Sequence, residues 1–159
     1  MSFKKSVAWM SLFLLSYFAI AYVREGEIIS AFAQTQAAQT KPPAVELITP
    51  EELKAKMDRN EGVTIIDVRN SYSDSDNKIK GAIHVKVRRL KFRLGFPPLK
   101  DIPRDSEVVT YCACPSDEAS IRAAQILMEA GFKRVHALKN GWQGWLRASG
   151  PVEPRPRGM

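Results

Sequence analysis

The two cysteines of the chain, Cys112 and Cys114, are the side chains best suited to covalent chemistry. One residue separates them, and two cysteines do not make the disulfide framework of a small secreted scaffold. A structural zinc site would need more ligands, and the only histidines of the sequence are His84 and His136. The pair is therefore predicted to be catalytic, redox-linked or incidental.

Cys112 is expected at the end of a buried strand, because residues 107–112 read Glu-Val-Val-Thr-Tyr-Cys. A turn over residues 114–119 and a helix over residues 120–130 should follow. Ligands bind outside the carboxyl ends of parallel strands, and the N–H groups of a turn and of a helix start lower the pKa of a thiol. A thiolate at this place can accept a sulfur atom and hold it as a persulfide. The alternative is an inert buried cysteine that packs as a small hydrophobe.

Strand-like and helix-like segments alternate along the chain around this cysteine. Strands are predicted at residues 45–48, 63–68, 82–85, 107–112 and 134–138, and helices at 49–60, 86–94, 120–130 and 141–146. Thr49, Pro50 and Glu52 start the first helix with a capping box. Trp142 and Trp145 are expected to pack the final helix onto the sheet. This alternation predicts an α/β domain whose parallel sheet is covered on both faces.

The amino-terminal residues 1–33 are predicted to direct export. Two lysines precede the uncharged, mostly apolar segment 6–23, and Ala31 and Ala33 form a small-residue site that signal peptidase accepts. Cleavage after Ala33 would give a periplasmic or extracellular protein. The alternative is an uncleaved membrane anchor, because segment 6–23 is just long enough to span a bilayer. In both cases the lysines stay inside and the domain lies outside the membrane.

The other boundaries follow from composition. Residues 34–44 are rich in Gln, Ala, Thr and Pro and are predicted to be a linker. The folded domain is expected over residues 45–153, with a flexible tail over residues 154–159. The chain has 45% hydrophobic and 26% charged residues, which is ordinary for a globular protein and excludes a mostly disordered one.

The chain is basic, with a net charge of +7. Positive side chains gather at Lys86, Arg88, Arg89, Lys91, Arg93, Lys100 and Arg104. No aromatic-rich RNA motif or helix-turn-helix pattern accompanies them, so no nucleic acid partner is expected. Two interpretations remain open: a solvated basic face, or a field that draws a small anionic substrate to the active loop.

Five segments, taken in order, resemble the rhodanese (sulfurtransferase) family. They are residues 64–69 (TIIDVR), 80–85 (KGAIHV), 108–112 (VVTYC), 130–135 (AGFKRV) and 138–145 (LKNGWQGW). They span most of the chain between residues 45 and 152, which resembles a single rhodanese domain. The resemblance implies a rhodanese-like three-layer α/β domain, in which helices flank a central parallel sheet.

The same resemblance implies a persulfide mechanism. A donor such as thiosulfate would give its outer sulfur to Cys112, and a thiophilic acceptor such as cyanide or a thiol would take it. Asp67 and Arg69 would buttress the active loop, and His84 would pack rather than act as a base. No cofactor and no metal are expected, and the sequence identifies no protein partner.

The loop after Tyr111 departs from the family pattern, in which a shorter run separates the cysteine from a serine. Counting back from Ser120 gives Cys114 as the nucleophile. Counting forward from the strand gives Cys112, which is favoured because strand ends move less than loop lengths. The loop residues expected to support the site are Ala113, Pro115, Ser116, Asp117, Glu118 and Ser120. The loop carries no arginine to clamp an oxyanion, so phosphatase activity is not expected.

Two features of this loop leave the function open. Asp117 and Glu118 are either helix-terminal residues that favour the helix dipole, or they face the cysteine, raise its pKa and repel thiosulfate. Cys114 is either passive or able to resolve a persulfide on Cys112 by forming a disulfide, which an exported location permits. The candidate functions are an exported sulfurtransferase, a non-catalytic rhodanese-like module that binds a protein or an anion, and a thiol redox protein that uses both cysteines.

Overall fold

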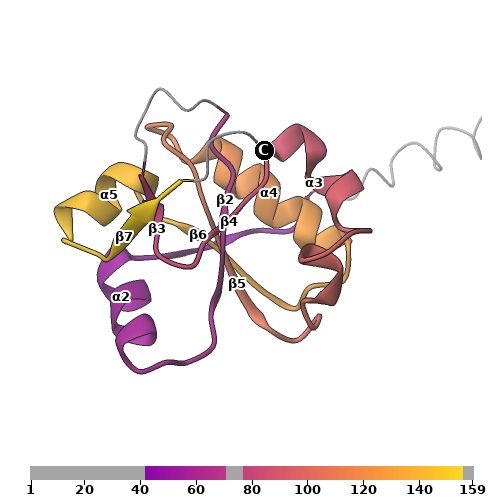
Figure 1. Ribbon diagram of the computed structural model, residues 1–159. Coiled ribbons are helices and arrows are strands. Elements are labelled where there is room, and N and C mark those ends of the chain that lie inside the picture. The colour runs from indigo at the N-terminus through magenta and orange to yellow at the C-terminus, as the bar shows by residue number, and fades with distance from the viewer. Residues whose placement is uncertain (1–41, 71–76, 156–159) are drawn as a thin grey trace, which may run out of the picture. The chain divides into compact units, whose positions relative to one another are not determined.

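The computed structural model describes residues 42–70 and 77–155 (Figure 1). The predicted export signal over residues 1–33, and most of the predicted linker, lie outside these residues. Within residues 42–70 and 77–155, no helix is long and apolar enough to cross a membrane.

A five-stranded parallel sheet forms the centre of the domain. Its strands are β1 (Glu46–Ile48), β2 (Thr64–Asp67), β4 (Ile83–His84), β5 (Glu107–Tyr111) and β6 (Arg134–Leu138). Their order in the sheet is β1-β6-β5-β2-β4, and every neighbouring pair is parallel. The prediction of a parallel sheet is confirmed, and the carboxyl ends of all these strands meet at one edge.

Helices cover both faces of this sheet. Figure 1 shows α2 (Pro50–Asp58) and α5 (Gly141–Arg147) on one side, and α3 (Val87–Arg93) and α4 (Glu118–Glu129) on the other. The short 3-10 helix η1 (Leu99–Asp101) follows α3. Successive side chains of a strand point to opposite faces, so Ile66 and Val108 pack in the cluster of α3 and α4, whereas Ile65 and Val109 pack in that of α2 and α5. The predicted three-layer fold is confirmed.

The two predicted signals that fix the helices on the α2–α5 side are both present. Thr49 Oγ1 accepts a hydrogen bond from the Glu52 backbone N–H at 3.2 Å, and the Glu52 carboxylate accepts one from the Thr49 N–H at 2.9 Å. Trp142 and Trp145 are buried between α5 and the sheet. The predictions of a capping box and of a tryptophan-packed final helix are confirmed.

A small second sheet was not expected from the sequence. The strands β3 (Asn77–Ile79) and β7 (Val152–Pro154) pair antiparallel. Each is short and carries polar residues or proline, which hide the strand pattern. Arg155 follows β7 and is buried, so ordered contacts continue two residues past the predicted domain end at residue 153.

Candidate active site

Cys112 lies directly after β5, at the carboxyl edge of the sheet. Its backbone carbonyl accepts a hydrogen bond from the Trp142 N–H at 2.8 Å, which joins it to the first turn of α5. The preceding carbonyl, of Tyr111, accepts one from the Val68 N–H at 3.0 Å, just beyond β2. The Cys112 side chain is 2% exposed and packs on the α4 side of the sheet. Backbone hydrogen bonds to both neighbouring elements therefore fix its position.

Cys112 and Cys114 form a disulfide, with their Cα atoms 5.7 Å apart. Cys114 is the more accessible of the two, because it is only partly buried. Both line a small cavity of about 240 Å³, whose walls are Val68, Arg69, Asn70, Cys112, Ala113, Cys114 and Ala119. Cys112 has no thiol in this form, so any nucleophilic chemistry requires prior reduction of the disulfide.

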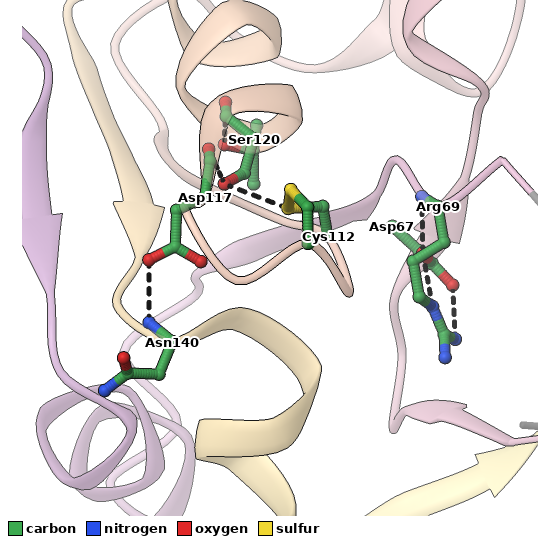
Figure 2. The surroundings of a disulfide bond; sticks show 8 residues. Asp67, Arg69, Cys112, Asp117, Ser120 and Asn140 are labelled. Carbon is green, nitrogen blue, oxygen red and sulfur yellow. Dashed lines mark hydrogen bonds and ion pairs between the residues drawn. A yellow bond between two sulfur atoms is a disulfide. The ribbon is translucent and has the colours of Figure 1, made fainter. Parts of the chain in front are cut away.

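The first turn of α4 stands beside the Cys112 sulfur (Figure 2). Ser120 Oγ lies 3.7 Å from Cys112 Sγ, and it donates a hydrogen bond to the Asp117 carbonyl at 2.8 Å. Asp117 has a left-handed backbone with φ of 54°, which turns the loop sharply into the helix. After reduction, a Cys112 thiolate would have the positive end of the α4 helix dipole close by, which lowers the pKa of a thiol.

The Asp117 carboxylate does not face the cysteine. Figure 2 shows it pointing toward Asn140, whose backbone N–H donates to Asp117 Oδ2 at 2.8 Å. Nor does it cap α4, because no side-chain hydrogen bond closes that helix start. Burial raises the pKa of Asp117, with the Asn140 hydrogen bond acting in the opposite direction. Asp117 therefore tethers the loop to the start of α5, which neither interpretation from the sequence described.

The other loop residues are more open to solvent. Glu118 is exposed at the start of α4, which fits a helix-terminal role. Pro115 and Ser116 are exposed, and Ala113 is partly buried. Among the residues that the structure describes, no cluster of histidine, cysteine and carboxylate side chains could hold a metal ion.

Asp67 and Arg69 form a buried ion pair beside the loop. Arg69 Nε lies 3.0 Å from Asp67 Oδ1, and Arg69 Nη2 lies 2.8 Å from Asp67 Oδ2. The Arg69 guanidinium also stacks 4.4 Å from the Trp142 ring centre and lines the cysteine cavity. Burial raises the pKa of Asp67, but hydrogen bonds from His84 and Arg69 and the Arg69 charge outweigh it, so the pKa lies well below its ordinary value.

Arg155 is a member of this cluster that the sequence did not reveal. Its Nη2 atom lies 2.9 Å from Asp67 Oδ2, so the carboxylate serves two buried arginines. His84 packs against the same group, with Nδ1 3.1 Å from the Asp67 carbonyl and 3.3 Å from Arg155 Nη2. Arg155 stands in a run of prolines and arginines near the end of the chain, which carries no local sign of burial.

A larger, basic hollow adjoins the cysteine cavity. It has a volume of about 640 Å³ and is lined by Asn70, Lys86, Val87, Arg88, Lys91, Arg122 and Ile126. Asn70 also lines the cysteine cavity, so the two are neighbours. Arg122 lines the hollow from α4. Together with Lys86, Arg88 and Lys91, it gives the hollow four basic side chains beside the active loop. The position of these side chains favours the interpretation that the positive charge draws a small anionic substrate to the active loop.

Gly141 allows the close approach of α5 to Cys112. It has a positive φ of 42°, and a Cβ atom there would collide with the Cys112 carbonyl oxygen. We expect Gly141→Ala to cost at least about 1 kcal/mol more free energy of unfolding than Gly62→Ala, which meets the left-handed penalty alone. Gly62 is the matched control because its φ is 69° and no atom lies within 4 Å of the position that a Cβ would take. Equal losses in urea unfolding would contradict the proposed collision.

The comparisons with known proteins agree with this arrangement. The rhodanese-like domain family matches residues 49–148. Thiosulfate sulfurtransferase GlpE of Glaesserella parasuis serovar 5 is 32% identical over 107 residues, which cover 67% of this chain and 91% of the relative. A sulfurtransferase of Allochromatium vinosum is 29% identical over 108 residues, covering 68% and 94%.

Solved structures give the same result. The rhodanese-like domain of the Anabaena sp. Alr3790 protein is similar with a TM-score of 0.57 and 27% identity, covering 76% of this chain and 88% of that one. The sheet order, the cysteine at the carboxyl end of its central strand and these matches lead to one conclusion. The chain belongs to the rhodanese-like domain family.

Proposed function

We propose that this protein is a sulfurtransferase that carries sulfane sulfur as a persulfide on Cys112. The observation that carries the proposal is the place of Cys112, between the end of β5 and the first turn of α4, with its sulfur 3.7 Å from Ser120 Oγ. Sulfurtransferases among its relatives, at about 30% identity, support the same chemistry.

The proposed reaction begins from the reduced form. The Cys112 thiolate attacks the outer sulfur of thiosulfate, the bond between the two donor sulfurs breaks, and sulfite leaves with the electron pair. Cys112 then bears the outer sulfur as a persulfide anion. An acceptor thiolate or cyanide attacks that outer sulfur, and the Cys112 thiolate is restored. The positive end of the helix dipole at the start of α4 stabilises the anionic sulfur at both stages.

Loading with sulfur tests the proposal directly. The reduced Cys114→Ser variant, incubated with thiosulfate and no acceptor, should gain about 32 mass units on the peptide that contains Cys112. Without Cys114, no Cys112–Cys114 disulfide can form and remove the added sulfur before the mass is measured. Absence of this gain from the Cys114→Ser variant would refute the proposal, provided that the variant is folded by circular dichroism.

The basic hollow supports an anionic donor. In the Cys114→Ser background, we expect the double substitution Arg88→Gln/Arg122→Gln to slow loading by thiosulfate at least about threefold at low salt, because two positive charges beside the site are removed. The difference should shrink in about 1 M salt, where charges are screened. The control Lys54→Gln/Arg147→Gln removes the same charge from α2 and α5. Equal slowing by both double variants would contradict a local role for the hollow.

A thiol redox function is the second candidate, and the Cys112–Cys114 disulfide favours it. It predicts a reversible disulfide that exchanges with a dithiol in the absence of any sulfur donor. In that case the Cys114→Ser variant, although folded, would not be loaded by thiosulfate. The loading experiment therefore separates the two functions.

We also propose that the domain acts outside the cytoplasm. The apolar segment 6–23 and the Ala-Phe-Ala sequence at residues 31–33 support export. The intact mass of the protein isolated from cells tests this, since cleavage after Ala33 leaves Gln34 as the first residue. A full-length chain in the membrane fraction would favour the anchor, and a full-length chain in the cytoplasm would refute export.

A further inference from the structure

Cys114 has a place in the site that simple sulfur transfer does not need. Its sulfur bonds to the sulfur of Cys112, and both residues line the same small cavity. The atom that Cys114 reaches is Cys112 Sγ, which is the inner sulfur of a persulfide on that residue. Attack at the inner sulfur expels the outer sulfur as sulfide, whereas attack at the outer sulfur would pass it on.

We propose that Cys114 resolves the Cys112 persulfide and thereby releases its outer sulfur as sulfide. The inference rests on the proposed persulfide function. The Cys114 thiol gives its proton to the outer sulfur of the persulfide anion, and the resulting thiolate attacks Cys112 Sγ. The bond between the inner and outer sulfurs breaks, and hydrosulfide leaves with the electron pair and that proton. The product is the Cys112–Cys114 disulfide that the structure holds.

The geometry favours this step over attack by an external acceptor. Cys112 is 2% exposed and opens into a cavity of about 240 Å³, so an external thiol must enter a narrow space. Cys114 is already inside it, with a Cα–Cα separation of 5.7 Å that suits a disulfide. A reactant held in place gains a large entropic advantage over one from solution.

A dithiol reductant completes the cycle. It attacks the sulfur of Cys114, the more exposed residue of the pair, and Cys112 leaves as the thiolate beside Ser120 and the start of α4. A second thiol of the reductant then frees Cys114 and forms the reductant's own disulfide. The net reaction of thiosulfate with a dithiol gives sulfite, hydrogen sulfide and a disulfide, so the sulfane sulfur is reduced and the dithiol is oxidised.

A single-turnover experiment tests the inference. The purified protein is reduced, freed of reductant and mixed with thiosulfate without an acceptor, and sulfide and intact mass are then measured. Wild type should release about one sulfide per chain and end about 2 mass units below its reduced form. Cys114→Ser should release none and keep about 32 added mass units, and Cys112→Ser should do neither. Glu51→Gln, at an exposed position in α2 outside the site, should behave as wild type.

The outcomes distinguish a failure of this inference from a failure of the proposed persulfide function. If Cys114→Ser gains sulfur and wild type also keeps it without releasing sulfide, Cys114 does not resolve the persulfide and the inference fails alone. If folded Cys114→Ser gains no sulfur, the persulfide function fails and the inference falls with it. Sulfide release that is unchanged in Cys114→Ser would also overturn the inference, because another group would then expel the sulfur.

Discussion

Replacing Cys112 with serine is expected to lower the rate of thiocyanate formation from thiosulfate and cyanide by about a thousandfold or more. A serine hydroxyl has a far higher pKa than a thiol and is a poor sulfur nucleophile, so no persulfide forms. Serine also matches the size of cysteine at this buried position, and its hydroxyl can still approach Ser120. The loss should therefore come from chemistry, and the assay is the initial rate with the reduced enzyme.

The Cys114→Ser variant is the matched control for this experiment. Both variants lose the disulfide, but only Cys112→Ser removes the sulfur that lies beside the first turn of α4. Cys114→Ser should retain cyanide-dependent turnover, because an added external acceptor replaces the resolving thiol. The reverse pattern would assign the nucleophile to Cys114, as the count back from Ser120 suggested. Full activity in both single variants would contradict a cysteine nucleophile altogether.

Local patterns were enough to predict the elements that carry the site. The β-branched runs of β2 and β5 indicate buried strands, and the capping box and paired tryptophans indicate α2 and α5. The end of β5 therefore placed Cys112 at the edge of the sheet. Helix α4 begins two residues earlier than predicted, because Asp117 adopts a left-handed backbone and starts the helix at Glu118.

The supporting contacts could not be predicted because they join residues far apart in the chain. Asp117 reaches Asn140, and Asp67 reaches Arg155 across most of the domain. Neither pair leaves a local pattern, since Asp117 and Asn140 are typical polar loop residues and Arg155 lies in the predicted tail. The role of Arg69 was accessible only through the family resemblance, which implied that Asp67 and Arg69 buttress the loop.

The buried carboxylate of Asp67 should make a second large contribution, to stability. We expect Asp67→Asn to lower the free energy of unfolding by about 3 to 5 kcal/mol, because it leaves Arg69 and Arg155 buried without their shared counter-ion. Urea unfolding at neutral pH measures this loss. Asp58→Asn is the control, because its pair with Lys54 is exposed and should contribute about 1 kcal/mol or less.

The Asp67 carboxylate should also determine how the free energy of unfolding changes as the pH falls into the acid range. Its pKa in the folded protein lies below that in the unfolded chain, because the hydrogen bonds and the Arg69 charge outweigh the effect of burial. Its contribution is therefore complete above the unfolded pKa of about 4 and is lost as the pH falls toward the folded value. Wild type should lose stability as the pH falls below about 4, and Asp67→Asn should lose less over the same range. Parallel curves for the two proteins would show that the Asp67 pKa is the same folded and unfolded, and that the two arginines do not hold it ionised.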